Sequence, residues 1–412
     1  MKKVLISSFD MEVGGVERSL ISMLNNFDYD NYDVDLMLYS HTGEFMELLP
    51  KKPNLLEESK KYKTFRLSIG QTIKRGNFAI GIGRLAARYK AKVMAKHKNI
   101  EEPGCIQMQY MWKYTLPFLP KLEKLYDVAI SYLWPHYFIA DKVNAKTKIA
   151  WIHTDYSTIH TDVNIDLKMW DKFDYIVSIS QDVTNAFLSK YPSLRSKIIL
   201  VENITSPEFI RDMAKYKQNE IIKEGDLFNI VSVGRYCYQK AFDNAIKALR
   251  ILHDRGYTNI KWYIVGYGED EDLYKRLIKE NKLEDSFILL GKKTNPYPYM
   301  KDCDLYVQPS RYEGKAVTVS EAQILGKPVV ITNYTTSKSQ IKHGIDGYIC
   351  DLDANGIASG IEEVYHNEKL RKLISDNCKN TDYSNSSELK KLYEAINNKY
   401  IGDRSKCHNA SR

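Results

Sequence analysis

Residues 305–332 constrain the fold of this chain more than any other stretch of the sequence. A short apolar run over 305–308 is followed by Pro309-Ser310, by an amphipathic segment over 316–325 that ends at Gly326, and by a β-branched run. This order is typical of a strand, a helix ended by glycine and a second strand, which together form one right-handed unit of a parallel sheet. Ligands bind at the carboxyl ends of such strands, and helix amino ends favour anions. The sequence therefore predicts an α/β fold with an anion-binding edge in this stretch.

Two glutamates lie at this predicted edge. Glu313 follows the first strand, and Glu321 lies eight positions later on the predicted helix. Carboxylates beside an anion site are consistent if the ligand offers phosphate to backbone amides and hydroxyl groups to the carboxylates, as a nucleotide sugar does. Taken alone, the pair is explained more simply by a solvated loop charge and a helix-surface charge.

The segment resembles the retaining glycosyltransferases of family four, which share the two-lobed GT-B fold and carry two glutamates separated by seven residues. The resemblance implies two Rossmann-like domains that face each other across a cleft. It also implies that Glu313 contacts the donor sugar and that Glu321 holds the ribose hydroxyls. The positions between them add donor-binding candidates: Gly314, Lys315, Ala316 and Val317. Many relatives have a Gly-Phe-Gly type of sequence here, so Lys315 bears on the identity of the sugar.

Two candidate positions lie in the amino-terminal half of the chain. Gly14-Gly15 follows a predicted strand over 3–8, and paired glycines let the backbone approach a diphosphate closely. The loop does not match the GxGxxG pattern of dinucleotide-binding proteins. His153 follows a predicted strand over 148–152. The resemblance places the glycines opposite the donor phosphates and His153 close to the transferred sugar.

Basic residues follow the first predicted strand of the carboxyl-terminal half, 229–234. Arg235 and Lys240 can clamp a diphosphate, the guanidinium as a fork and the ammonium as a compact charge. Two ordinary surface cations are the alternative. The family usually has glycine after the lysine, and here Ala241 stands in that place. Lys293 lies in a later loop where the family holds the nucleotide base through backbone groups.

The length of 412 residues suits two α/β domains rather than one core. The resemblance implies an acceptor-binding domain over 1–205, with a carboxyl-terminal helix over 387–412 packing back on it. A donor-binding domain over 206–386 follows. The pattern loosens over 204–226, which predicts a linker there.

Positive charge concentrates in residues 60–98, which hold twelve Lys or Arg and no Asp or Glu, against a net charge of +8 for the chain. Apolar side chains recur between these cations at helical spacing: Phe78, Ile82, Leu85, Ala86, Tyr89, Val93 and Met94. A basic amphipathic helix favours peripheral contact with an anionic membrane. Packing of the apolar face onto its own domain, with a solvated basic back, is an alternative of equal weight. No nucleic-acid-binding motif accompanies the charge, so nucleic acid is not an expected partner.

The remaining composition favours a cytoplasmic protein. No apolar run approaches the roughly 18 residues of a membrane-spanning helix. The run after Met1-Lys2-Lys3 is too short for a signal peptide. The six cysteines form no CxxC pair, as is typical of reduced cytosolic thiols.

The resemblance implies a retaining hexosyltransferase that moves a sugar from a nucleoside diphosphate sugar, with UDP as the favoured nucleotide, to an acceptor hydroxyl. A saccharide or lipid-linked acceptor in the assembly of a bacterial-type surface polysaccharide, such as capsule, suits a protein on the inner membrane face. Catalytic roles fall on His153, Glu313, Arg235 and Lys240. Because fixed cations would stabilise the departing diphosphate, no metal and no cofactor is expected.

Three alternatives remain open at this stage. Metal-dependent transferases use Asp-x-Asp, a spacing that begins here at Asp33, Asp302 and Asp351. A nucleotide-sugar epimerase of the same fold would need the same phosphate and ribose contacts. A non-catalytic GT-B partner subunit would usually lack one of the glutamates or phosphate-binding cations, all of which are present in this sequence.

Overall fold

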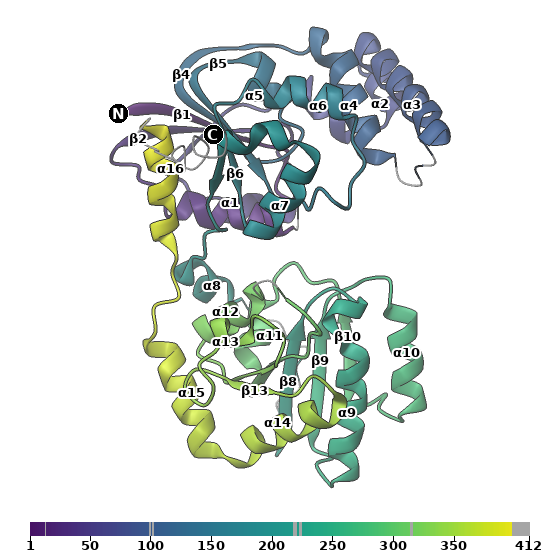
Figure 1. Cartoon of the computed structure of the whole chain (residues 1–412), viewed down its shortest axis with the longest axis vertical. Coiled ribbons are helices and arrows are strands. Elements are labelled where there is room, and N and C mark those ends of the chain that lie inside the picture. The colour runs from purple at the N-terminus through teal and green to yellow at the C-terminus, as the bar shows by residue number, and fades with distance from the viewer. Residues whose placement is uncertain are drawn as a thin grey trace, which may run out of the picture. The chain divides into compact units, whose positions relative to one another are not determined.

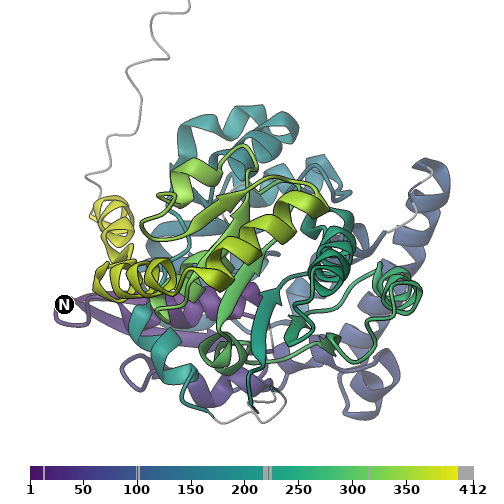
Figure 2. The same cartoon turned by 90° about the horizontal axis from the view of Figure 1, so that it is seen from below.

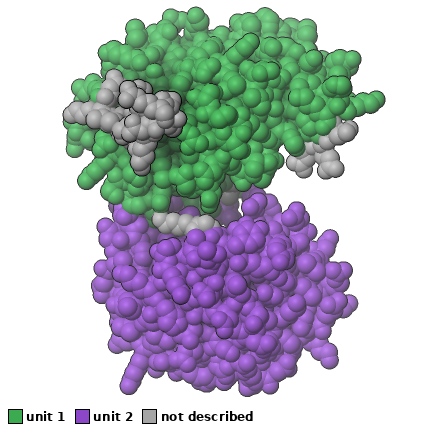
Figure 3. Space-filling view, viewed as in Figure 1, with its two compact units in different colours: residues 1–205, 385–412 green, residues 206–384 purple. Residues whose placement is uncertain are grey.

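The computed structural model describes residues 1–12, 14–98, 100, 103–216, 221, 225–313 and 316–397. It consists of two compact units (Figures 1 and 3). Unit 1 is formed by Met1–Thr205 and by the chain from Asn385 onward, and unit 2 is formed by Ser206–Ser384. Each unit has its own parallel sheet and its own hydrophobic core.

The sheet of unit 1 has the strand order β3-β2-β1-β4-β5-β6-β7 in the described part of the chain, and all neighbours are parallel. Val4 of the first strand pairs with Val34 on one side and Val128 on the other. Both faces of this strand are buried, which explains its continuous apolar run. The strands are β1 Lys2–Ser8, β2 Tyr32–Leu38, β3 Asn54–Leu55, β4 Leu122–Ser131, β5 Val143–Ile152, β6 Tyr175–Ser178 and β7 Ile198–Leu200.

Residues 60–98, which the sequence predicts to be one basic segment, form η2, α2 and α3 of unit 1. No helix in the described part of the chain is both long and apolar enough to cross a membrane. The α-helices are α1 Gly15–Asn25, α2 Ile69–Lys74, α3 Phe78–Lys98, α4 Gly104–Thr115, α5 Tyr137–Lys142, α6 Val163–Trp170, α7 Gln181–Lys190 and α16 Leu389–Ile396. Short 3₁₀ segments are η1 Glu44–Leu48, η2 Tyr62–Arg66, η3 Leu116–Phe118, η4 Pro192–Lys197 and η6 Ser386–Glu388.

Helix α16 returns from the far end of the chain to pack beside β2 (Figure 1). The ring of Tyr393 stacks on that of Tyr32, with centroids 5.2 Å apart and planes within 14°. Its hydroxyl accepts a hydrogen bond from the backbone N–H of Asp28 at 2.9 Å, and Lys2 Nζ donates to the carbonyl of Ile396 at 3.2 Å. The described part of the expected helix over 387–412 ends at residue 397.

The sheet of unit 2 has the order β10-β9-β8-β11-β12-β13 in the described residues, again with parallel neighbours. Helices lie on both sides of it (Figure 2): α9 packs against α14, whereas α8 packs against α11 and α12. The strands are β8 Phe228–Val233, β9 Ile260–Val265, β10 Phe287–Gly291, β11 Leu305–Gln308, β12 Val329–Thr332 and β13 Tyr348–Cys350. The helices are α8 Pro207–Met213, α9 Phe242–Asp254, α10 Glu271–Glu280, α11 Tyr297–Asp302, α12 Val317–Ile324, α13 Ser337–Gln340, α14 Ala354–His366, α15 Glu368–Asn380 and the 3₁₀ segment η5 Tyr238–Lys240.

The strand, helix and strand expected over residues 305–332 are confirmed as β11, α12 and β12. Gly326 has φ 69°, the left-handed conformation in which a helix commonly ends and which glycine adopts without steric cost. Parallel pairing of β11 with β12 places the loop that follows β11 at the carboxyl edge of the sheet.

The linker predicted over 204–226 is wrong for its first half, which forms α8 within unit 2. Ser206 Oγ accepts a hydrogen bond from the amide of Phe209, and Pro207 occupies the first helical turn. Phe209 and Ile210 are buried, so the segment is held by apolar packing in addition to its amino-terminal cap. Residues 217–220 and 222–224 of the predicted linker lie outside the described part of the chain.

Ala241 immediately precedes α9 in a left-handed conformation, with φ 54° and ψ 37°. An L-amino acid pays about 1–2 kcal/mol for this conformation because its Cβ approaches the following carbonyl oxygen. The family's usual glycine at this position thus has a steric reason, and Ala241 holds the same backbone under strain.

We expect Ala241→Gly to raise the free energy of unfolding by about 0.5–1 kcal/mol, because relief of strain outweighs the entropy that glycine adds to the unfolded chain. Ala245→Gly, inside the same helix and buried, is the matched control and should lower the free energy of unfolding by about 1 kcal/mol or more. Urea unfolding of both variants measures the two signs. A destabilised Ala241→Gly protein would contradict the strain.

Candidate functional site

Two loops of unit 2 meet at the carboxyl ends of β8 and β11, and one arginine joins them. The guanidinium of Arg311 contacts both carboxylate oxygens of Asp243, at 2.9 and 2.6 Å, and donates to the carbonyl of Tyr238 at 2.6 Å. Its backbone N–H donates to the carbonyl of Gln239 at 2.8 Å. Hydrogen bonding to Asp243 raises the pKa of Arg311. A forked pair of this kind fixes the geometry of the loops it connects.

Glu313 lies in the second of these loops with its side chain only 7% exposed. Lys240 Nζ lies 2.5 Å from Glu313 Oε1, and Ser310 Oγ donates to the same oxygen at 2.6 Å. Gln239 Nε2 donates to Oε2 at 3.2 Å. The structure therefore brings together two residues that the sequence predicted separately, and the alternative of a solvated loop charge at Glu313 is wrong.

A buried polar network behind Glu313 was not predicted. Gln308, the last residue of β11, donates through Nε2 to Ser310 Oγ at 2.8 Å. Gln308 Oε1 accepts from the hydroxyls of Tyr306, at 2.8 Å, and Thr318, at 3.1 Å. The signal in the sequence was a glutamine inside an apolar strand, since a buried amide must find hydrogen-bond partners. This network orients Ser310 toward the carboxylate of Glu313.

Glu321 lies on α12 and is 4% exposed, so the alternative of a helix-surface charge is also wrong. The hydroxyl of Tyr297 donates to Glu321 Oε1 at 2.8 Å. A carboxylate at this depth must be held by donors, and the tyrosine supplies one of them.

The amino end of α12 differs in part from the expectation. Ala316 N–H donates to Gln340 Oε1 at 3.2 Å, so this amide already has a partner. No side chain of the described residues caps the helix, and Val317, its first residue, is 49% exposed. Gly314 and Lys315 lie outside the described residues. The amides that begin the helix, at Val317 and Thr318, make no hydrogen bond within the described part of the chain.

Glycines allow the loop after β8 to approach the loop after β9. A Cβ atom at Gly266 would lie 1.8 Å from the carbonyl oxygen of Gly234, and one at Gly268 would lie 2.4 Å from that of Tyr236. The methylene groups of Lys240 lie over Gly234, where a Cβ atom would be 3.2 Å from Lys240 Cδ. Close backbone packing therefore directs Lys240 toward Glu313.

Two further predicted cations follow strands of the same sheet. Arg235 is exposed and makes no ion pair among the residues that the structure describes. Lys293 follows β10, and its Nζ lies 5.8 Å from the centroid of the Tyr299 ring.

The predicted glycines of unit 1 begin α1, with Gly14 at the cap position and Gly15 as the first helical residue. The carboxylate of Glu17 folds over this turn, and a Cβ atom at Gly14 would lie 2.1 Å from Glu17 Oε2. Burial raises the pKa of Glu17. The helix amino end that was expected to face phosphate is therefore covered by a carboxylate from the same turn.

His153 directly follows β5 in unit 1. Its ring is nearly parallel to that of Trp151, with centroids 6.1 Å apart, and lies 4.7 Å from the ring of Tyr132. Its Nε2 is buried and has no hydrogen-bond partner in the described structure. Burial lowers the pKa of His153 to about 3, so the imidazole is neutral near pH 7 and its unprotonated nitrogen can accept a hydrogen bond.

The Asp-x-Asp sequences perform structural tasks. Asp35 accepts hydrogen bonds from Lys124 and Tyr126, Asp304 accepts from the amide of Asn229, and Asp353 caps α14. Within the described ranges, no group of three or more His, Cys, Asp or Glu side chains is arranged to hold a metal ion.

Comparison with known families assigns the part of the chain that carries this edge of unit 2. Residues 213–381 match the model of the family described as glycosyl transferases group 1. Residues 213–381 therefore form a domain of that family. The match covers β8 to β13 and therefore the whole edge that carries Arg235, Lys240, Glu313 and Glu321. The predicted family is confirmed.

Relatives of this glycosyl transferase family include CapM of Staphylococcus aureus, named as a capsular polysaccharide biosynthesis glycosyltransferase. It is 26% identical over 237 residues, which are 55% of this chain and 60% of CapM. The chain spans between 42% and 65% of the length of several curated relatives that it matches.

Solved structures confirm the predicted GT-B fold. Anabaena HepE, in complex with UDP-glucose, has a TM-score of 0.59 at 16% identity, over 97% of this chain and 100% of that one. A variant of S. aureus TarM, in complex with fondaparinux, alpha-GlcNAc-glycerol and UDP, has a TM-score of 0.61 at 16% identity, over 96% and 100% of the two chains.

We expect the stability of unit 1 to fall on acidification because of two buried histidines. His136 donates to or accepts from Ser131 Oγ at 2.8 Å, and burial together with the nearby His153 lowers its pKa to about 3. Since an unfolded histidine titrates near 6.5, this stability is fully present above about pH 6.5 and is lost as the pH falls toward 3. The slope is about 1.4 kcal/mol per pH unit for each histidine.

His153→Gln should reduce this slope by about 1.4 kcal/mol per pH unit, the contribution of one histidine. The same change at the exposed His160 should leave the slope unaltered. Urea unfolding between pH 7 and pH 5, followed by tryptophan fluorescence, measures the difference. Equal slopes in the wild type and in His153→Gln would show that His153 is not held neutral by burial.

Proposed function

We propose that the protein is a retaining hexosyltransferase that moves a sugar from a UDP-sugar to a hydroxyl of a saccharide or lipid-linked acceptor in surface-polysaccharide assembly. The observation that carries this proposal is the buried pair of Lys240 and Glu313, fixed by Ser310 at the carboxyl edge of the unit 2 sheet. The family supports transfer, CapM supports capsule, and the ligands of HepE and TarM support UDP as the nucleotide.

Unit 2 is the proposed donor-binding domain. Arg235, Lys240 and the first amides of α12 would bind the diphosphate, because oriented donors stabilise the charge that develops as the diphosphate departs. In the described structure Glu313 Oε1 accepts from Lys240, Ser310 and, at 3.5 Å, Gln308, whereas Oε2 accepts from Gln239. Because each carboxylate oxygen can accept about two hydrogen bonds, the site proposed for a sugar hydroxyl is on Oε2.

Glu321 is the proposed partner of the ribose hydroxyls. It is buried and oriented by Tyr297, so a hydroxyl that reaches it meets an acceptor that is already in place. Lys293 is assigned to the loop that holds the base.

Unit 1 is the proposed acceptor-binding domain. In it, the neutral imidazole of His153 can accept a hydrogen bond from a sugar hydroxyl at Nε2. Gly14 and Gly15 keep their proposed role toward the donor phosphates, for which the Glu17 carboxylate would have to move or accept a proton.

We propose that the reaction needs no metal and no cofactor. Arg235 and Lys240 are fixed positive groups at the edge where the diphosphate charge would develop, and this is the task that a divalent metal performs in other transferases.

We expect one member of a panel of UDP-, GDP- and ADP-sugars to raise the melting temperature, with UDP as its nucleotide. Glu321→Gln should weaken that ligand about tenfold or more, because a hydrogen bond to a charged group contributes about 1.5–3 kcal/mol. Glu284→Gln, at an exposed position of the same unit, is the matched control and should bind like the wild type.

The same preparation separates the competing functions. If neither UDP nor any donor raised the melting temperature, the result would contradict the transferase and favour a partner subunit. Conversion of the donor to its epimer without any acceptor would contradict transfer, and loss of activity in EDTA would contradict metal independence.

We further propose that α3 places unit 1 on an anionic membrane surface. The helix packs on α4 through small residues, and a Cβ atom at Gly83 would lie 3.3 Å from the carbonyl oxygen of Tyr114. Ile80 is buried, but five other large apolar side chains of the helix are exposed, which contradicts the alternative in which this apolar face packs onto its own domain: Phe78 62%, Ile82 64%, Leu85 49%, Tyr89 73% and Val93 46%.

Charge identifies the surface that would cover this apolar stripe. The stripe is flanked by exposed basic residues, among them Arg88, Lys90, Lys92 and Lys96, and α3 contains no Asp or Glu. An apolar stripe between cations is complementary to a bilayer that carries anionic lipids.

We expect the protein to sediment with vesicles that contain phosphatidylglycerol and to remain in solution with purely zwitterionic vesicles. The triple change Lys90→Glu, Lys92→Glu, Lys96→Glu should weaken binding at least about hundredfold, at about 1 kcal/mol for each cation near the surface. Phe78→Ser with Tyr89→Ser should also weaken it, whereas Leu125→Ser, 65% exposed elsewhere in unit 1, should not. If the triple lysine variant and the Phe78, Tyr89 variant both bound the vesicles like the wild type, the proposed role of α3 would be refuted.

A further inference from the structure

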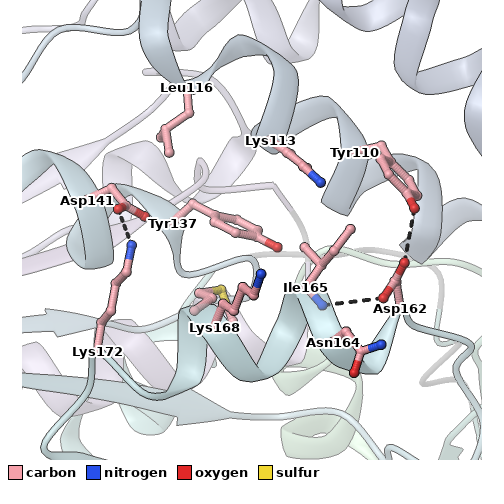
Figure 4. Close-up of a pocket in the computed structure, with 11 residues that line it drawn as sticks. Tyr110, Lys113, Leu116, Tyr137, Asp141, Asp162, Asn164, Ile165, Lys168 and Lys172 are labelled. Carbon is pink, nitrogen blue, oxygen red and sulfur yellow. Dashed lines mark hydrogen bonds and ion pairs between the residues drawn. The ribbon is translucent and has the colours of Figure 1, made fainter.

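A pocket of about 450 Å³ lies in unit 1 between α4, α5 and α6 (Figure 4). None of the residues assigned to the donor or to the transferred sugar lines it. Its apolar wall includes Leu116, Ile165 and Met169, and its polar wall includes three lysines. The pocket therefore offers one site with both a charged and an apolar side.

The charges of the pocket are unequally compensated. Lys172 forms an ion pair with Asp141. Asp162 accepts from the hydroxyl of Tyr110 at 3.0 Å and from the amide of Ile165 at 3.3 Å. Lys113 and Lys168 have no ion pair among the described residues, and both point into the pocket (Figure 4). Two ammonium groups are thus available to an anion.

Tyr137 adds a hydroxyl that the protein leaves without a partner. The residue is 6% exposed, and its hydroxyl has no hydrogen-bond partner among the described residues. Its ring stacks on Trp112, with centroids 6.0 Å apart, and directs the hydroxyl into the pocket (Figure 4). Burial raises the pKa of Tyr137, so the hydroxyl keeps its proton and can donate. A buried hydroxyl without a partner is costly, which indicates that an acceptor from a ligand completes it.

We propose that this pocket binds the phosphate group of an amphiphile, with the adjoining part of its apolar chain against Leu116 and Ile165. Two ammonium groups and one hydroxyl match the three terminal oxygens of a phosphate monoester. The pocket also adjoins α3, since the hydroxyl of Tyr110, which lines the pocket, lies 3.1 Å from Met94 Sδ of that helix. A membrane surface along α3 would therefore supply the ligand, and free phosphate is the other source of the same chemistry.

Calorimetric titration of the full chain, without donor, tests this assignment separately from transfer. The probes are dihexanoyl phosphatidic acid below its micellar concentration, dihexanoyl phosphatidylcholine and inorganic phosphate. We expect phosphatidic acid to bind and the other two probes to bind at least about tenfold more weakly. Inorganic phosphate lacks the apolar chain, and phosphatidylcholine lacks the phosphate monoester. Equal binding of inorganic phosphate would overturn the amphiphile, and equal binding of phosphatidylcholine would overturn the phosphate monoester.

Two variants locate the binding in the pocket. Tyr137→Phe should keep the melting temperature of the wild type, because its hydroxyl has no hydrogen-bond partner among the described residues, and should weaken the binding of phosphatidic acid about tenfold. Lys113→Gln with Lys168→Gln should weaken it more. Lys51→Gln with Lys121→Gln removes the same charge from exposed positions of unit 1 and should have little effect. Unchanged binding in Tyr137→Phe and in the Lys113, Lys168 variant would overturn the proposal.

Discussion

A carboxylate buried at the edge of a sheet requires donors around it, and the site of unit 2 is organised by that requirement at Glu313. Its ion pair with Lys240 is nearly dry, with the two side chains 7% and 16% exposed. Removing either partner would leave an uncompensated buried charge, which is far more destabilising than the pair is stabilising. The two loops must therefore stay together, and the forked contact of Arg311 with Asp243 holds them in register.

The surface of unit 1 follows a different rule, in which close packing takes priority over burial of large side chains. The buried residues of α3 are mostly small, among them Gly81, Gly83, Ala87 and Ala91. A Cβ atom at Gly81 would lie 2.4 Å from Ile73 of α2, and one at Gly83 would lie 3.1 Å from Thr115 of α4, so neither contact has room for a larger residue. Five of the large apolar residues of α3 are exposed to water, whereas Ile80 is buried. Exposed apolar area of this kind is costly for a protein that meets only solvent, and it becomes useful when another surface covers it.

Much of this fold could be predicted from the sequence because its signals are local. The strand, helix and strand from β11 to β12 follow from periodicity and from Gly326, and the positions of Glu313 and Glu321 follow from that pattern. The orientation of α3 could not be predicted, because the helical spacing of its apolar residues is the same whether they face inward or outward. Helix α8 was not predicted because its few apolar residues, Phe209, Ile210 and Met213, lie among charged ones and form no clear periodic pattern. Ser206-Pro207 is nevertheless an ordinary helix start. The coverage of Gly14 by Glu17, and the network through Gln308, depend on side-chain geometry that spacing does not encode.

The chain passes from unit 1 to unit 2 after Thr205 and returns after Ser384, so the units are connected at two points of the chain. Unit 1 is discontinuous in sequence, and α16 completes it by stacking Tyr393 on Tyr32. A fragment that stops at residue 205 would therefore be an incomplete unit 1 with an exposed aromatic face. Unit 2, in contrast, is formed by one uninterrupted stretch, residues 206–384. A single fragment therefore contains all of unit 2, whereas unit 1 requires two separate stretches of the chain.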